Sequence, residues 1–541
     1  MLIRLAGGHV VDPANGRDGV GDLWIRDGRI VDPPQGGAAD ETYDVRGRMV
    51  LAGAIDIHSH IAGSNENMGR LLLPELRRVE HPGHEKPRGA FNTREIGRLY
   101  AAMGFTTVVE PAVLPHHALQ AHLELADIPI IDKATLTVLG NDDFTLNLLR
   151  KKESAQAVQD TIAWTLATSR GLGVKVINAG GAEAFKENVR TFSLDDEVPD
   201  YGVSSRAIVK ALQHGVTALG LPHPLHVHCN NLGVPGNVDT AVATIAAAEG
   251  LRLHLAHVQF YAYGKEGPRG FSSAAPRLAE AVNAARNVTV DIGQVMFGQT
   301  VTISADVLRQ FNARNSAKPR KWLIYDGDSN GGGIVAYDYR ATNFHNAVQW
   351  AAGLELFLLI ADPARVFFTT DHPNGAPFTA YPDIFALLMD RDLRAQWLSR
   401  LPQEAVAVTT LPAIARKYSW SEIATMTRAA PAQLLGLKDR GHLGAGAIAD
   451  VAVYAPNRDR AAMFRAAALV FKDGTLVVRD GEVVQEPYGR TLTALPPRDA
   501  AIERRMRDYY MDRYGLTPEF MAVAERLLGP RATFEGVPCR T

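Results

Sequence analysis

The middle of the chain alternates eight short apolar runs with stretches of helical pattern, and this alternation limits the fold more than any other feature. The apolar runs cover residues 52–60, 105–110, 136–140, 174–178, 225–229, 253–258, 288–292 and 366–370. Residues 237–249 show the helical pattern: apolar residues recur on one face, Asn237 can cap the start, and Gly250 marks the stop.

Eight strand–helix units in succession predict an α/β fold, a (β/α)8 barrel of the TIM type. In such a barrel the active site lies at the carboxyl ends of the strands. A doubly wound open sheet is the competing topology. Histidine, lysine and aspartate residues in or just after the apolar runs favour the barrel.

Both ends of the chain have the pattern of short strands joined by tight turns. Asp27-Gly28 separates two apolar segments, and Asp473-Gly474 and Asp480-Gly481 repeat the pattern. A chain of 541 residues is too long for one compact core. We therefore expect a barrel with C-terminal helices over residues 52–436, a composite β-domain from residues 1–51 and 437–495, and a helical tail over residues 496–541.

Composition excludes several classes of function. The chain is 46% hydrophobic and 21% charged with a formal net charge of -2, which gives no reason to expect nucleic acid or a membrane as a partner. No apolar run reaches the roughly 20 residues of a membrane span, and the N-terminus lacks a signal-peptide pattern. Two cysteines, Cys229 and Cys539, cannot build a disulfide framework, so we expect a cytoplasmic protein.

Side chains that suit a metal ion stand at the ends of several predicted strands. His58 and His60 close the first run, and residues i and i+2 of a strand share a face, so both imidazoles can bind one ion. Three more candidates stand at or just after later runs: His228, His257 and Asp371. Imidazole nitrogens and carboxylate oxygens suit zinc or a similar divalent ion.

Two residues of this set admit two interpretations each. Lys175 lies inside the fourth run, where an unpaired charged amine is costly. It is either a snorkelling or ion-paired lysine, or a neutral lysine that CO2 converts into a metal-bridging carbamate. Asp371 is either a turn residue or the acceptor of a proton from an attacking water.

Other residues of the fifth and sixth runs are expected to be supporting. His226 shares a face with His228 but lies deeper in the strand. Strand parity turns His254 away from His257. Cys229 should face away from the ligand that precedes it and pack in the core.

Five motifs give the chain a resemblance to a known superfamily. They occupy residues 7–16, 56–63, 175–181, 226–237 and 369–378. With these motifs the chain resembles the metal-dependent amidohydrolase superfamily over residues 1 to about 490. Within that superfamily it is most similar to the A subunits of formylmethanofuran dehydrogenases and of the related bacterial formyltransferase/hydrolase complexes.

The resemblance implies a metal site and a reaction. The family's binuclear site falls, position by position, on His58, His60, carboxylated Lys175, His228, His257 and Asp371. This set implies two divalent ions, with Zn2+ the best suited. In this family the A subunits handle the C–N bond of an N-formyl group on a furan-bearing one-carbon carrier and release or consume formate.

We expect a formamide hydrolase inside a complex that includes a formyltransferase and other subunits. A formylmethanofuran dehydrogenase component working in the formate-consuming direction is the first alternative. A free-standing cyclic amidase, similar to hydantoinases or dihydroorotases, and a scaffold without chemistry are the others. Two cysteines cannot ligate iron–sulfur clusters, so any redox chemistry would lie in another polypeptide.

Substrate-binding residues are expected around the same site. The motifs after the fifth and eighth runs supply Asn230, Asn231 and His372. Carriers of this family bear carboxylates, and guanidinium groups bind these bidentately. The loop after the first run would overhang the site and carries Arg70, Arg77, Arg78 and Arg88. Alternatively this is a solvated basic loop, partly neutralised by Glu75, Glu80 and Glu85.

The C-terminal tail has the composition of a contact surface. Tyr509, Tyr510 and Tyr514 alternate there with Arg507 and Arg513, and these residue types are enriched at interface cores. We expect the tail to dock on the β-domain of this chain or on a partner.

Overall fold

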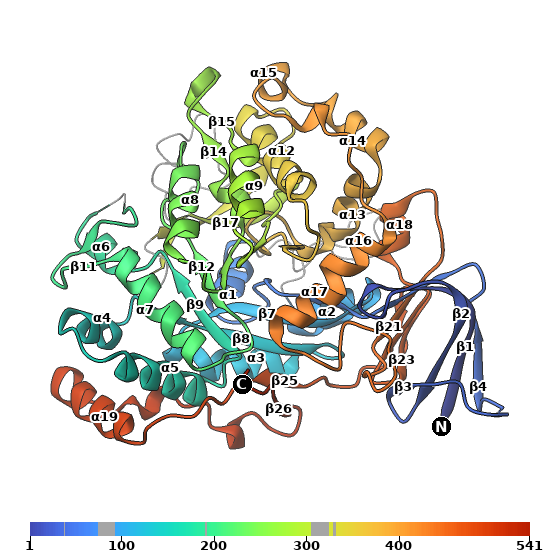
Figure 1. The fold of residues 1–541 in the computed structure, drawn as a ribbon, viewed down its shortest axis with the longest axis horizontal. Coiled ribbons are helices and arrows are strands. Elements are labelled where there is room, and N and C mark those ends of the chain that lie inside the picture. Colours follow the sequence, from blue (N-terminus) through green and yellow to red (C-terminus); the bar gives the residue numbers. More distant parts are fainter. Residues whose placement is uncertain (37, 74–91, 190–191, 305–323, 328–331, 541) are drawn as a thin grey trace.

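A barrel of eight parallel strands forms the centre of the molecule (Figure 1). The computed structural model describes residues 1–540 except 37, 74–91, 190–191, 305–323 and 328–331. The strands follow one another around the barrel in chain order: β6 (Ala54–Asp56), β7 (Phe105–Val113), β8 (Asp132–Leu139), β9 (Gly173–Ile177), β12 (Leu225–His228), β13 (Leu253–Leu255), β16 (Val288–Asp291) and β20 (Val366–Phe367). A parallel bridge between Ser59 and His372 joins the first strand to the eighth. The predicted (β/α)8 barrel is confirmed.

Helices connect the strands and pack around the barrel (Figure 1). They include α1 (Ser64–Leu72), α2 (Thr93–Ala102), α3 (Ala118–Asp127), α4 (Asp143–Arg150), α5 (Ala155–Ser169), α7 (Ser205–Ala218), α8 (Val238–Ala247), α9 (Ala275–Ala284) and α12 (Phe344–Leu359). Side-chain caps start several of them, as where Asn92 accepts the backbone N–H groups of Arg94 and Glu95. Helix α8 starts directly after Asn237 as predicted, but the Asn237 side chain makes no cap hydrogen bond, because its Oδ1 accepts the backbone N–H of Tyr263.

The region expected to be helical after the barrel is helical. It contains α13 (Tyr381–Met389), α14 (Arg391–Leu398), α15 (Gln403–Val406), α16 (Trp420–Ala424) and α17 (Ala430–Leu435). A single turn of π-helix at Thr425–Ala429 separates the last two. Within the described residues, no helix is both long enough and apolar enough to cross a membrane.

Both termini build one antiparallel-rich sheet beside the barrel (Figure 1). The N-terminal strands are β1 (Leu2–Asp12), β2 (Arg17–Arg26), β3 (Arg29–Val31), β4 (Glu41–Asp44) and β5 (Met49–Ala52); the C-terminal ones are β21 (Val451–Tyr454), β22 (Leu469–Lys472), β23 (Thr475–Arg479) and β24 (Glu482–Val483). Antiparallel pairing of β5 with β21 joins the two halves. Leu5, Val50 and Val453 share one apolar core there. The expected composite β-domain is present.

Two short strands near the C-terminus join the barrel sheet and correct the expected boundaries at residues 437–495 and 496–541. β25 (Thr491–Thr493) pairs in parallel with Lys133 and Ala134 of β8, and β26 (Phe534–Gly536) pairs with β25. β9 pairs with β8 only from Leu136 onward. The start of β8 therefore has a free edge, and β25 occupies it.

The tail docks on barrel helices, and the expected contact with the β-domain is wrong. Helix α19 (Ala501–Tyr514) lies along α4 and α5 (Figure 1). Ile502 and Met506 pack against Phe144 and Trp164. Asp143, at the start of α4, accepts hydrogen bonds from the hydroxyls of Tyr201, Tyr509 and Tyr514.

A small antiparallel sheet between β16 and α12 was not predicted. It consists of β17 (Gly298–Ser304), β18 (Ile324–Gly327) and β19 (Gly332–Tyr339). Val301 and Ala336 of this sheet pack against Leu72 and Leu73 at the end of α1. The Thr300 hydroxyl donates to the carbonyl of Pro373, so the sheet reaches the loop that follows the eighth barrel strand.

Candidate metal centre

Six sequence-predicted residues converge at the carboxyl end of the barrel. His58 Nε2 lies 3.0 Å from Asp371 Oδ1, and His60 Nε2 lies 3.3 Å from the same oxygen. Lys175 Nζ lies 3.3 Å from His58 Nε2. The His257 ring stands 5.3 Å from that of His58 and 4.6 Å from that of His228, measured between centroids. The structure thus brings together His58, His60, Lys175, His228, His257 and Asp371.

This arrangement fits a metal ion. His58, His257 and Asp371 each offer a ligand atom, and the three atoms lie within 4.8 Å of one another. Within the described part of the chain, His228 Nε2 and His257 Nδ1 are buried and have no hydrogen-bond partner. A buried polar atom without a partner is costly. Metal coordination would satisfy these nitrogens.

The burial of this centre shifts the pKa of its members. Burial lowers the pKa of His257 to about 3 and that of His228 well below its usual value, so both imidazoles are neutral. Burial alone would raise the pKa of Asp371, but His257, His58 and His60 hold it well below its usual range. Burial lowers the pKa of Lys175 to about 8 despite the attraction of Asp371 and Asp291. Neutral imidazoles and an ionised carboxylate are the forms that bind metal.

Two carboxylates that sequence reasoning missed hold the first pair of histidines. Glu110 of β7 accepts from His60 Nδ1 at 3.0 Å and from the backbone N–H of Ile61 at 2.7 Å. Asp291, the last residue of β16, accepts from His58 Nδ1 at 3.0 Å. Both acids stand at or near the ends of predicted apolar runs, which is the same signal that identified the ligands.

Two further buried histidines, His226 and His254, contact members of this centre. His226 Nε2 lies 3.0 Å from His58 Nδ1, and His254 Nε2 lies 2.9 Å from Asp291 Oδ2. Strand parity predicts that His254 faces away from His257; its ring lies 4.6 Å from that of His226. Strand β13 ends at Leu255, and His257 adopts a left-handed conformation (φ 35°), so strand parity does not extend to it.

The three expected substrate-binding residues outside the arginine loop, Asn230, Asn231 and His372, differ from one another in burial and contacts. Asn230 is buried, and its amide donates to Asn178 Oδ1 at 2.9 Å. Asn231 has a left-handed backbone (φ 62°) and a long contact of 3.4 Å with Ser193 Oγ. His372 is buried, with Nε2 at 3.5 Å from the buried carboxylate of Glu66.

Of the four arginines expected to bind the carrier, the structure describes Arg70. Arg70, on α1, forms an ion pair with Glu124 at 3.0 Å and donates to Asn67 at 2.8 Å. Arg77, Arg78 and Arg88 lie outside the described residues, as do Glu75, Glu80 and Glu85. At Arg70, therefore, a neighbouring acid already balances the charge.

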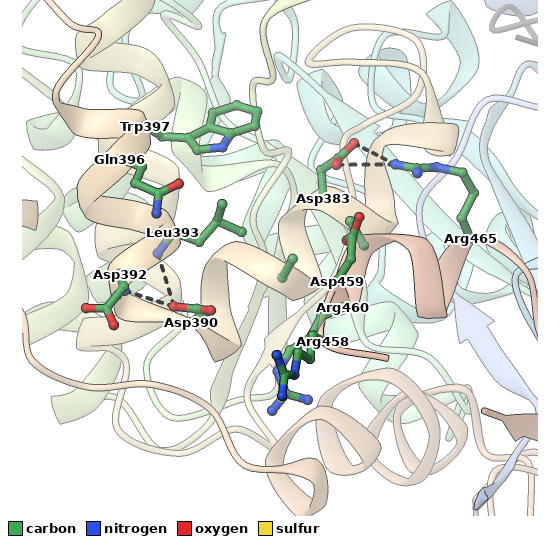
Figure 2. Close-up of a pocket in the computed structure, with 12 residues that line it drawn as sticks. Asp383, Asp390, Asp392, Leu393, Gln396, Trp397, Arg458, Asp459, Arg460 and Arg465 are labelled. Atoms are coloured by element: carbon green, nitrogen blue, oxygen red, sulfur yellow. Dashed lines mark hydrogen bonds and ion pairs between the residues drawn. The ribbon is translucent and has the colours of Figure 1, made fainter. Parts of the chain in front are cut away.

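A cavity of about 390 Å³ lies between α13, α14 and α18 (Arg460–Arg465), away from the six residues (Figure 2). Three of its carboxylates have structural partners. Asp390 and Asp459 cap α14 and α18, and Asp383 lies 3.3 Å from Arg465. The cavity shares none of its lining with the candidate metal centre.

Comparison with known sequences identifies the class of protein. A profile of the Amidohydrolase family matches residues 41–485. The A subunit of the formyltransferase/hydrolase complex Fhc of Methylorubrum extorquens is 54% identical over 548 residues, and the match covers 100% of both chains. Protein FwdA of Methanocaldococcus jannaschii is 37% identical over 518 residues, which covers 91% of this chain and 90% of that protein. The chain belongs to the amidohydrolase family.

Solved structures agree with this assignment. A chain of the FhcABCD formyltransferase/hydrolase complex from Methylorubrum extorquens, crystallised with methylofuran, matches with a TM-score of 0.94 at 54% identity over 100% of both chains. A D-aminoacylase matches with a TM-score of 0.52 at 16% identity and covers 90% of this chain and 99% of its own. The second likeness concerns the fold alone.

Proposed function

We propose that this chain hydrolyses the N-formyl group of a formylmethanofuran-type one-carbon carrier. Water cleaves the formamide C–N bond, which yields formate and the free amine of the carrier. The observation that carries the proposal is the full-length similarity to a component of a formyltransferase/hydrolase complex whose structure contains methylofuran. The cluster of candidate ligands supports it, because amide hydrolysis requires an activated water.

The six residues of the centre are proposed to hold two divalent ions, and zinc suits their nitrogen and oxygen donors best. Lys175 would bind as a carbamate, formed when its neutral amine attacks CO2 and releases a proton. Burial lowers the pKa of Lys175 to about 8 and so favours the neutral amine. When bound, such a metal pair acidifies water and polarises a carbonyl group.

Asp371 is the proposed proton carrier. It is buried, and its neighbouring histidines keep it ionised. An ionised carboxylate can take the proton of the attacking water and return it to the leaving nitrogen. We propose that the carrier is bound by Asn230, Asn231, His372, Arg70, Arg77, Arg78 and Arg88.

The proposed setting is a cytoplasmic complex that also contains a formyltransferase. The Methylorubrum relative is named for such an assembly, and this chain matches it over its full length. The two cysteines of this chain are free, which suits a reducing compartment. Formate consumption in a formylmethanofuran dehydrogenase is the second candidate. The higher identity to the hydrolase component favours hydrolysis.

A formate-release assay tests the proposal. Metal-loaded chain, alone and with co-expressed partner subunits, would be given an N-formylated furan carrier and, in parallel, dihydroorotate and hydantoin. We expect formate from the carrier and no ring opening of the cyclic amides. Turnover of the cyclic amides without formate release would replace the proposal with a cyclic amidase.

A further inference from the structure

The carboxylate of Asp291 lies directly behind the candidate metal centre. This residue ends β16, a strand that supplies none of the six candidate ligands, and it is 0% exposed. Its Oδ2 contacts His58 Nδ1 at 3.0 Å, and its Oδ1 accepts the backbone N–H of His257 at 2.6 Å. One side chain therefore touches two of the candidate ligand residues.

The contact with His58 decides which ring nitrogen carries the proton. An ionised carboxylate oxygen only accepts hydrogen bonds, so Nδ1 of His58 must be the protonated nitrogen. Nε2 then keeps its lone pair. That atom is the one that faces Asp371 Oδ1 at 3.0 Å and Lys175 Nζ at 3.3 Å, where an ion would bind.

The contact with His257 holds an unfavourable backbone conformation. His257 has φ 35°, which is strained for a residue with a side chain. The Oδ1 of Asp291 fixes the N–H of this residue from one side. Gly293 packs against it from the same loop, since a side chain there would come within 2.5 Å of the Cβ of His257. The loop after β16 thus shapes the turn from which the His257 ring projects.

We propose that Asp291 is a positioning residue of the metal centre, which fixes the proton of His58 on Nδ1 and holds the turn that presents His257. The inference rests on the metal-dependent function proposed above. Carboxylates behind ligating histidines typically contribute about 10–100-fold to metal affinity or activity. The effect of Asp291 passes through the two ligands, because its oxygens are occupied by them and by His254.

Metal binding to the metal-free chain tests this role without an activity assay. Zn2+ or Co2+ would be titrated against a chromophoric chelator, and the Co2+ absorption spectrum recorded. Asp291→Asn keeps the shape but offers one acceptor oxygen, so it cannot serve both His58 and His257. We expect its metal affinity to fall about 10–100-fold and its Co2+ spectrum to change.

Thr289→Val is the matched control. Thr289 lies on the same strand, and its hydroxyl is 2.8 Å from Nδ1 of His254, so its loss alters a histidine that is not a candidate ligand. We expect wild-type affinity and spectrum. Asp291→Asn with wild-type affinity and spectrum would overturn the inference.

Two further results distinguish a failure of this inference from a failure of the proposed function. If Asp291→Asn does not fold, nitrogen-15 NMR of histidine-labelled wild-type protein decides the tautomer of His58, assigned by its loss in His58→Gln. Protonation at Nε2 in the metal-free chain would refute the role of Asp291. A wild-type chain that binds no metal would refute the proposed function and this inference with it, whereas wild-type binding with an unaffected Asp291→Asn refutes the inference alone.

Discussion

Lys175 and Lys472 are each 1% exposed, yet they differ in the acids that surround them. At the amino end of the barrel, Lys472 Nζ donates to Asp132 at 3.1 Å and to both oxygens of Asp450 at 3.0 Å. At the carboxyl end, the hydrogen bond that Lys175 Nζ makes within the described residues is the 3.3 Å contact with His58. Burial lowers the pKa of both lysines, but the acids around Lys472 raise its pKa above the usual range.

The two ends of the barrel differ in whether their buried polar atoms have hydrogen-bond partners. Asp132 also accepts from Arg440 at 3.0 Å, and Arg440 in turn pairs with Glu535 at 2.9 Å. Among the described residues, no side-chain atom of Asp132, Lys472 or Arg440 is buried without a partner, whereas His228 and His257 each have such a nitrogen. A saturated network ties the barrel to the C-terminal part of the chain. An unsaturated one is left open for a ligand.

The largest effect on stability should come from the saturated end. Asp132→Ala leaves Lys472 and Arg440 buried without their shared acid, and removing one partner of a buried pair costs about 3–5 kcal/mol. We expect urea denaturation of the metal-free chain to show this loss. Lys175→Ala, measured in the same way, should cost much less. Equal losses would contradict the comparison.

The stability that Asp132 contributes should also depend on pH. Lys472 and Arg440 hold the pKa of Asp132 well below its usual range, although burial alone would raise it. A lowered folded-state pKa contributes stability above the unfolded value of about 3.9, and this contribution is lost as pH falls further. The stability difference between wild type and Asp132→Asn should therefore shrink below about pH 4. A constant difference would show that Asp132 acts by packing alone.

At the open end, Asp371→Asn should affect turnover more than folding. Loss of a proton carrier lowers the rate about 10²-fold or more. We expect formate release to fall by that factor while most of the bound metal and the melting temperature are retained. Near-normal turnover would assign the proton to another group, with His372 the next candidate.

Metal should stabilise the folded chain only when the centre at the carboxyl end of the barrel is intact. A ligand present at about 100 times its Kd raises the free energy of unfolding by about 2.7 kcal/mol. Zinc should therefore raise the melting temperature of the wild type and of Asp132→Asn, and much less that of Lys175→Ala. Bicarbonate with a short-chain carboxylic acid should restore part of the metal content of Lys175→Ala. Two tightly bound ions in Lys175→Ala without such rescue would rule out the carbamate.

The smallest effect is expected at the tail, where the charged cluster is half exposed. Tyr509→Phe removes the hydrogen bond to Asp143 and the one accepted from Asn147, and each is worth about 0.5–1.5 kcal/mol. Tyr510→Phe is the control, because no hydrogen bond of its hydroxyl is found in the described part of the chain. Calorimetry of both variants would measure the difference. If Tyr509→Phe lost as much unfolding free energy as Asp132→Ala, the tail would be as important for stability as the network around Asp132.

The sequence was sufficient for the barrel and for the gathering of the candidate ligands. Each barrel strand is a short apolar run, and parallel strands bring their carboxyl ends to one edge. Asp291 and Glu110 stood in the same runs, but their partners lie on strands distant in sequence. A sequence gives residue types at strand ends and no distances between them.

Long-range pairing explains the other differences. Three-residue strands such as β25 carry almost no periodicity, and their partner is set by a free edge 358 residues away. Asn237 makes no side-chain cap because a tertiary donor, the backbone N–H of Tyr263, takes its Oδ1. Strand parity does not relate His254 to His257, because the strand ends at Leu255.

The position of β25 and β26 also has a consequence for biosynthesis. Pairing of β25 with β8 joins residues 133–134 to residues 491–492, and proteins emerge from the ribosome N-terminal end first. The edge at the start of β8 therefore stays unpaired until β25 has left the ribosome. Asp132 is likewise made long before its partners Arg440, Lys472 and Arg490. Early strands of the barrel therefore depend on segments that are made several hundred residues later.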